Sequence, residues 1–166
     1  MDSTVVIEPA YNALSDVRAL FEAYTAMLVT HDPAFQIYLD IQHYADELRA
    51  PAAKYAPPDG RLYLARVDGR AAGCIALRRL DGERCEMKRL YVQPQYRGRG
   101  LARQLIRRIT EDARQIGYRC MLLDTLPGGR RPPLPAAGIL RDPLLQRQPC
   151  GVHTVFPAGP VNPAST

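Results

Sequence analysis

A short glycine- and arginine-rich segment, residues 95–102, constrains this chain more than any other part of the sequence. It lies between an apolar run typical of a strand and an amphipathic run typical of a helix. The first turn of a helix has unpaired N–H groups and partial positive charge, so a loop leading into it can bind an anion. Gly98 and Gly100 leave the backbone open to phosphate oxygens, and Arg97 and Arg99 can add charge. The segment therefore predicts a phosphate-binding strand–loop–helix unit.

Three other interpretations of a glycine-rich loop fit this segment less well. A Walker loop requires a lysine after its glycines, and none follows here. A dinucleotide-binding loop requires a third glycine where this chain has Arg103, and it would follow the first strand of the domain. An arginine–glycine segment that binds RNA would be repeated, whereas this one occurs once.

The N-terminal part of the chain predicts a strand and two helices. Residues 5–7 are apolar and β-branched, and Pro9 closes this short strand. Apolar residues then recur at helical spacing over about 13–29 and near 36–49, which predicts two amphipathic helices. Prolines and glycines between residues 51 and 60 indicate a loop.

Three consecutive strands with tight turns should follow as an antiparallel meander. The strands are expected at residues 62–67, 73–79 and 85–92. Asp68-Gly69 is a strong hairpin signal, and Asp81-Gly82 predicts the second turn. Because adjacent strands joined by tight turns run in opposite directions, these three should form one sheet.

The segment after the glycine-rich loop predicts a helix followed by a buried strand. The helix covers about 100–116, with Gly117 at the position of a C-terminal cap. Residues 120–124 are then continuously apolar up to an aspartate. Such a run is typical of a strand that lies parallel to its neighbour across a helical crossover.

Length and composition limit the possible classes of protein. A chain of 166 residues suits one domain. No apolar run reaches the ~18 residues that span a bilayer, and the N-terminus lacks the pattern of a secretory signal. We therefore expect a cytoplasmic protein with no membrane partner. Four cysteines and three histidines lack the spacing of a metal site, so we expect no metal.

The loop and its surroundings resemble the GNAT family of acetyltransferases. Gln95-x-x-Gly98-x-Gly100 matches the Q/R-x-x-G-x-G/A motif of this family, and residues 90–94 resemble the strand end that precedes it. The resemblance covers residues 3–126 in the order strand, two helices, meander, loop, helix, strand. It implies an α/β (α+β) fold: a mixed sheet with an antiparallel meander and a strand–loop–helix–strand unit for acetyl-CoA.

The resemblance also implies an activity and a set of site residues. The expected reaction transfers acetyl from acetyl-CoA to a primary amine of a small molecule or peptide by direct attack. Backbone amides of the loop would hold the pyrophosphate, and the preceding strand end would bind the pantetheine arm and polarise the acetyl carbonyl. The residues expected to bind the cofactor are Leu90, Tyr91, Val92, Gln95, Tyr96, Arg97, Gly98, Arg99, Gly100, Leu101 and Ala102.

Candidate catalytic groups lie on the strands beside this loop. Glu86 could act as the base, directly or through a water, because its strand leads to the cofactor. The alternative is a carboxylate paired with Lys88. Asp124 and Thr125 could contact the substrate, or else serve in a turn or cap. Many family members supply the acid from a tyrosine on a later helix, but no tyrosine follows Tyr118 here.

The match to the family stops near Gly128, and a shift of reading frame would explain the break. Residues 127–166 hold nine of the fifteen prolines and one acidic residue. When residues from 130 onward are read one base later, permitted synonymous codons restore the Leu-Tyr and Gly-Phe pairs that the family carries there. We therefore interpret residues 1–126 as an incomplete GNAT domain and 127–166 as a basic, proline-rich tail that is out of frame.

This interpretation has structural and functional consequences. The final helix and two strands of the family should be missing or irregular, which would leave the strand through Asp124 as an unpaired edge. A CoA-binding module without catalysis is one alternative, and a basic nucleic-acid-binding domain is another. The net charge of +5 falls to +2 over residues 1–126 (18 basic, 16 acidic), which argues against nucleic acid. A homodimer is compatible with the sequence.

Overall fold

The computed structural model describes residues 3–41, 43–123, 147–148 and 151–155. The helices and strands follow one another as β1 (Val5–Pro9), α1 (Leu14–His31), α2 (Phe35–Ile41), α3 (Tyr44–Arg49), α4 (Pro51–Lys54), β2 (Arg61–Val67), β3 (Arg70–Arg79), β4 (Arg84–Val92), the 3-10 turn η1 (Pro94–Tyr96), α5 (Leu101–Ile116), β5 (Cys120–Leu123), β6 (Arg147–Gln148) and β7 (Gly151–Val155).

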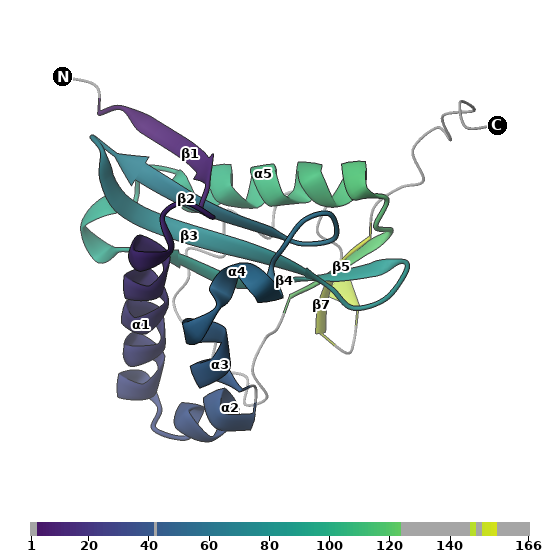
Figure 1. Ribbon diagram of the computed structural model, residues 1–166, viewed down its shortest axis with the longest axis horizontal. Coiled ribbons are helices and arrows are strands. Elements are labelled where there is room, and N and C mark those ends of the chain that lie inside the picture. The colour runs from purple at the N-terminus through teal and green to yellow at the C-terminus, as the bar shows by residue number, and fades with distance from the viewer. Residues whose placement is uncertain (1–2, 42, 124–146, 149–150, 156–166) are drawn as a thin grey trace.

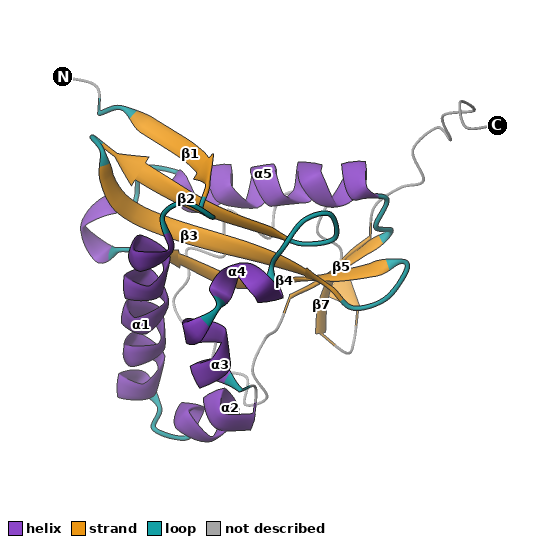
Figure 2. Ribbon diagram, viewed as in Figure 1, coloured by secondary structure: helices purple, strands orange, loops and turns teal. Residues whose placement is uncertain are grey.

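The strands form one mixed sheet in the order β1-β2-β3-β4-β5-β7-β6. Helix α5 lies on one face of this sheet, and α1–α4 lie on the other (Figures 1 and 2). Strands β2, β3 and β4 form the predicted antiparallel meander, and β5 runs parallel to β4 after the α5 crossover. The α/β fold expected from the sequence is therefore confirmed.

Helix α5 is held on its face of the sheet by an apolar stripe and one polar anchor. Its buried residues recur every four positions, so they form one side of the helix: Leu101, Leu105, Ile109 and Ala113. Asp112, also buried, accepts a hydrogen bond from the Tyr63 hydroxyl of β2 at 2.5 Å. Gly117 ends the helix in the left-handed conformation, with φ 104°, as the sequence predicts.

The opposite face is covered by shorter helices, and one prediction about them is wrong. The sequence pattern suggests a single helix near 36–49, but the structure has α2 and α3 there. His43 has a left-handed backbone, with φ 54°, and therefore starts a new helix rather than continuing the old one. Pro51 then opens α4, because proline fits the first turn of a helix but not its interior.

The far edge of the sheet differs from the sequence-based expectation. Strand β7 pairs antiparallel with β5 from Cys120 opposite Val155 to Leu123 opposite Val152. The prediction that β5 is an unpaired edge is therefore wrong, because the backbone of β7 satisfies its hydrogen-bonding groups. Strand β6 is only two residues long. Residues 124–146, where the family's final helix would lie, are outside the described part of the chain.

A β-bulge interrupts the pairing of β3 with β4. Cys74 lies opposite Tyr91, but the next pair joins Ala76 to Lys88, so Arg89 and Leu90 together oppose one residue of β3. Arg89 adopts φ 56°. Such left-handed backbone is uncommon for a residue other than glycine, and the surrounding contacts must hold it in place.

The β3 backbone approaches β4 closely beside this bulge, at Gly73. A Cβ atom added to Gly73 would lie 2.6 Å from the backbone oxygen of Tyr91. We predict that Gly73→Ala forces the two strands apart and lowers the free energy of unfolding by about 1–3 kcal/mol. Urea unfolding followed by circular dichroism measures this change.

Gly82→Ala is the matched control for this substitution. Gly82 lies in the β3–β4 turn, has no positive φ, and a Cβ there would meet no atom within 4 Å. Its replacement should change the free energy of unfolding by less than about 0.5 kcal/mol. Equal effects of the two substitutions would contradict the close approach at Gly73.

Candidate functional site

The glycine-rich loop leads from the end of β4 into α5 with both of its glycines in left-handed conformation. Gly98 has φ 77° and Gly100, the residue before α5, has φ 74°. A Cβ atom built on either glycine would meet nothing within 4 Å. The backbone here is therefore uncovered by the described residues, and a phosphate group could approach it directly.

The N-terminus of α5 offers backbone donors to such a group. Among the described residues, no side chain caps this end of the helix, and its first turn contains no acidic residue. The first intrahelical bond joins the Gln104 N–H to the Gly100 carbonyl at 3.1 Å. The N–H groups before Gln104 have no acceptor within the helix. With the dipole of a 16-residue helix, they suit an anion.

Local hydrogen bonds shape the loop around these donors. The Tyr96 N–H donates to the Gln93 carbonyl at 2.9 Å, which forms the turn η1. Arg97 folds back so that its Nε donates to the Val92 carbonyl at 3.0 Å. The Arg99 guanidinium lies 5.8 Å from the centre of the Tyr96 ring. Arg97 thus fixes the loop to the strand, a role that the sequence did not predict.

Strand β4 has an open backbone edge immediately before this loop. Its parallel pairing with β5 joins residues 84–87 to 120–123. Within the described part of the chain, residues 89–92 have no partner strand on that side. The predicted contacts Leu90, Tyr91 and Val92 lie on this edge, so the structure brings them into line with the loop. An extended ligand arm could pair with this edge and place its phosphates at the loop.

Glu86 lies on β4 next to the same edge, on the face covered by α1–α4. Its carboxylate accepts a hydrogen bond from Arg78 Nε at 2.5 Å and lies 3.5 Å from Lys88 Nζ. The ion pair with Lys88, which is the alternative to catalysis, is therefore present. A catalytic role for Glu86 stays a prediction. Asp124 and Thr125 are outside the described residues.

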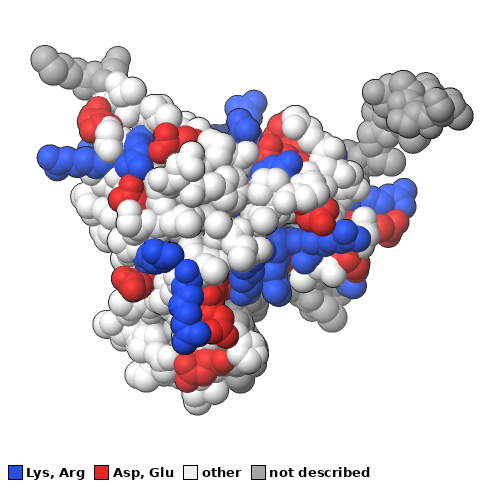
Figure 3. Space-filling view, in the orientation of Figure 1, with Lys and Arg blue, Asp and Glu red and all other residues white. Residues whose placement is uncertain are grey.

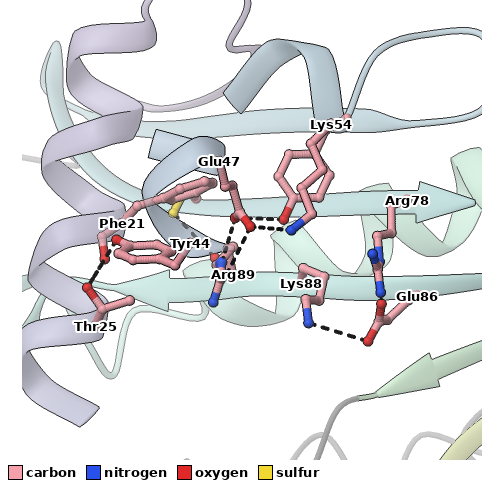
Figure 4. A network of polar contacts seen from close by, with 11 residues as sticks. Phe21, Thr25, Tyr44, Glu47, Lys54, Arg78, Glu86, Lys88 and Arg89 are labelled. Carbon is pink, nitrogen blue, oxygen red and sulfur yellow. Dashed lines mark hydrogen bonds and ion pairs between the residues drawn. The ribbon is translucent and has the colours of Figure 1, made fainter. Parts of the chain in front are cut away.

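A second polar group, which the sequence did not predict, lies on this face and is centred on Glu47 of α3 (Figure 4). The Glu47 carboxylate accepts hydrogen bonds from Arg89 Nε at 2.6 Å, from the Tyr55 hydroxyl at 2.8 Å and from Lys54 Nζ at 2.5 Å. Burial alone would raise the pKa of Glu47, but the hydrogen bonds and charges of Arg89 and Lys54 outweigh it and lower the pKa from 4.5 to about 2.

The sequence held only a weak signal for this group. Residues 88 and 89 are consecutive basic residues in a strand that is otherwise largely apolar, and strand alternation would place one of them on each face. The bulge changes that alternation, so Arg89 reaches Glu47 while Lys88 stays beside Glu86 (Figure 4). No pattern in the sequence reports where a bulge lies.

The described residues contain neither a metal-binding cluster nor a membrane-spanning helix. They contain no group of three or more histidine, cysteine or acidic residues that could hold a metal ion. None of their helices combines the length and the apolar character needed to cross a bilayer.

Comparison with known proteins supports the assignment suggested by this geometry. Residues 20–131 match the profile of the acetyltransferase (GNAT) family, which is two thirds of the chain. The chain belongs to the GNAT acetyltransferase family. It is 44% identical over 94 residues to an uncharacterised N-acetyltransferase of Schizosaccharomyces pombe. That match covers 55% of this chain and 58% of the yeast protein.

Solved structures of GNAT proteins share the fold. The PaiA N-acetyltransferase of Thermoplasma acidophilum, in complex with coenzyme A, gives a TM-score of 0.65 at 12% identity over 92% of this chain and 99% of its own. A GNAT acetyltransferase of Brucella melitensis, in complex with acetyl-CoA, gives 0.63 at 17% identity over 93% and 90%. Acetyl-CoA is the cosubstrate of the GNAT family.

The pKa of Glu47 predicts how the stability of this GNAT domain depends on pH. Because the folded-state pKa is lowered from 4.5 to about 2, ionised Glu47 stabilises the fold above pH 4.5, and this stabilisation is lost as the pH falls towards 2. The shift corresponds to about 3 kcal/mol. Glu47→Gln should therefore be less stable than the wild type above pH 4.5, and the difference should narrow on acidification.

Urea unfolding at a series of pH values measures this difference. Asp46→Asn is the control, since Asp46 is the neighbouring residue and forms an exposed ion pair with Arg49 at 2.8 Å. Its loss should cost less than about 1 kcal/mol at every pH. A Glu47→Gln difference that stays constant across the acid range would contradict the lowered pKa.

Proposed function

We propose that this chain derives from an acetyl-CoA-dependent N-acetyltransferase that acts on a primary amine of a small molecule or peptide. The observation that carries the proposal is the continuous path, within the described residues, from the open edge of β4 to the uncapped N-terminus of α5. This path supplies the two kinds of backbone contact that a CoA thioester needs, hydrogen bonds along its arm and donors for its phosphates. The family match adds the reaction type.

The chemistry needs few groups from the protein. The amine nitrogen bonds to the thioester carbonyl carbon while the carbon–sulfur bond breaks. The proton of the amine passes to Glu86 or to water, and another proton must reach the departing thiolate. Backbone donors at residues 90–92 would stabilise the negative charge that develops on the carbonyl oxygen. The loop binds and orients, and takes no part in proton transfer.

We also propose that the segment after residue 127 is out of frame and that this limits catalysis. The match to the family profile ends at residue 131, close to the point where the sequence changes in composition. The chain has no tyrosine beyond Tyr118 to protonate the thiolate. On this view residues 1–126 are an incomplete GNAT domain, and the chain binds acetyl-CoA but transfers its acetyl group slowly or not at all.

A basic nucleic-acid-binding domain is the weaker alternative. Binding to nucleic acid needs a surface dominated by positive charge. Figure 3 shows basic and acidic side chains interspersed on the visible face. Among the described residues several basic side chains are ion-paired, for example Arg66 with Glu8 and Asp16. A CoA-binding module without catalysis remains the stronger alternative, and turnover separates it from an enzyme.

The first test measures acetyl-CoA affinity by titration calorimetry for Gly100→Ala and Gly117→Ala. These two glycines flank the same helix, both have positive φ, and a Cβ on either meets nothing within 4 Å. Their replacement should therefore strain the backbone similarly. Only Gly100→Ala places a methyl group against the pyrophosphate, so we expect a loss of affinity of about tenfold, or 1.4 kcal/mol, for this variant alone. Equal affinities in the two variants would contradict the proposed site.

The second test compares the chain with a version in which the codons from residue 130 are read one base later. Thiol release from acetyl-CoA is followed with a panel of primary amines. We expect the original chain to bind acetyl-CoA with little or no turnover, and the re-read chain to turn over. Rapid turnover by the original chain would contradict the proposed loss of catalytic groups. Codons that cannot encode the Leu-Tyr and Gly-Phe pairs would exclude the frame shift.

A further inference from the structure

The bulge residue Arg89 is held through its carbonyl and through its side chain. Its carbonyl accepts a hydrogen bond from Cys74 Sγ at 3.3 Å, across the break in the β3–β4 ladder. Burial raises the pKa of the Cys74 thiol, so this thiol keeps its proton and can donate. Because the backbone of Arg89 is in the left-handed region, both restraints act on a conformation that arginine rarely adopts.

The side-chain restraint is a two-point ion pair with Glu47. Arg89 Nε and Nη2 donate to the two carboxylate oxygens at 2.6 and 3.0 Å. The side chains are 5% and 0% exposed. The Arg89 guanidinium also lies 5.0 Å from the centre of the Tyr44 ring, and Thr25 of α1 donates to the Tyr44 hydroxyl at 3.0 Å. Helices α1 and α3 are thus linked to one residue of β4 (Figure 4).

Stability alone does not account for such a pair. The free-energy cost of removing two charges from water offsets most of the attraction between them. Apolar residues of similar volume in the same positions often make the fold equally stable. What an ion pair with two parallel hydrogen bonds adds is orientation, because the planar guanidinium meets the carboxylate in one geometry. The residue that this ion pair orients is Arg89, which lies in the bulge of β4 next to the open edge of that strand.

Leu90 immediately follows Arg89, and both residues lie opposite Ile75 at the bulge between β3 and β4. The backbone position of Leu90 therefore depends on the conformation of Arg89. Leu90 is also the first of the three residues expected to contact the acetyl and pantetheine groups. Hydrogen-bond donors stabilise developing charge best when they are oriented before the reaction begins.

We infer that Glu47 is a positioning residue which, through Arg89, fixes the bulge so that the backbone beside it can polarise the acetyl carbonyl. The inference rests on the proposed function. The proposed positioning role of Glu47 differs from a purely structural role in one respect. Loss of the pair should alter the environment of the acetyl carbonyl even in molecules that remain folded and still bind the pyrophosphate.

Infrared spectroscopy of acetyl-CoA labelled with carbon-13 at the thioester carbonyl tests this inference without requiring turnover. Polarisation of the carbonyl lowers its stretching frequency. On the wild-type chain we expect a frequency below that of acetyl-CoA in solution, and on Glu47→Gln a return towards the solution value. The affinity for CoA without the acetyl group should be largely retained, because the hydrogen bonds of Glu47 go to Lys54, Tyr55 and Arg89 and not to the loop that would hold the pyrophosphate. When Glu47→Gln is introduced into the chain re-read from residue 130, kcat should fall, whereas KM for acetyl-CoA should not change.

A second variant and a control keep the test decisive if Glu47→Gln does not fold. Arg89→Lys retains a cation for Glu47 but cannot form both hydrogen bonds, so it should stay folded and shift the frequency in the same direction. Asp46→Asn, on the same helix and exposed, should leave the frequency unchanged. Circular dichroism establishes that each variant is folded at the temperature of the measurement.

The outcomes separate the inference from the function on which it rests. A carbonyl frequency that is lowered in the wild type and equally lowered in folded Glu47→Gln and Arg89→Lys would overturn the inference and leave the proposed function intact. Failure of the wild-type chain to bind both CoA and acetyl-CoA would overturn the proposed function and the inference with it. Loss of the shift in both variants, with CoA affinity retained, supports both.

Discussion

Strand β4 pairs with β3 along nearly its whole length but, among the described residues, with β5 over four residues only, and the candidate site depends on this asymmetry. Complete pairing on both sides would leave no backbone groups for a ligand, since every donor and acceptor in the strand interior would be satisfied. The described pairing with β5 ends at Leu123, so within the described part of the chain residues 89–92 have no partner strand on that side. That edge runs directly into the loop, and the loop into the N-terminus of α5.

The two layers of helices hold the two ends of this path by different means. On one face, α5 is fixed by its apolar stripe and by the hydrogen bond from Tyr63 to Asp112, so its N-terminus cannot move far from the end of β4. On the other face, α3 is joined to the β4 bulge by the Glu47–Arg89 ion pair. In the proposed site, the phosphate end would thus depend on packing, and the acetyl end on a buried polar contact.

Much of this fold could be predicted because its signals are local. The turn at Asp68-Gly69, the left-handed cap at Gly117 and the open loop at Gly98 and Gly100 each follow from a residue whose backbone preference is strong. The periodicity of α5 likewise follows from residues four apart on one helix. The family resemblance added the cosubstrate, which these local signals support but do not name.

The features that escaped prediction depend on residues distant in the sequence. Glu47 lies in a polar helical segment, where a carboxylate usually faces solvent, and only the position of Arg89 makes it a buried partner. The break at His43 has no glycine or proline to mark it. The pairing of β7 with β5 depends on a chain reversal that composition does not reveal. In each case a tertiary contact outweighs the local preference.

The most direct test of this account is to map backbone amide shifts by NMR while acetyl-CoA is added to the isotope-labelled chain. If the edge of β4 and the N-terminus of α5 form one binding path, the largest shifts should fall in two groups, residues 90–92 and 98–103. Smaller changes should follow at Arg89. Shifts confined to the exposed arginines of α5, or the absence of shifts at saturating acetyl-CoA, would contradict the account.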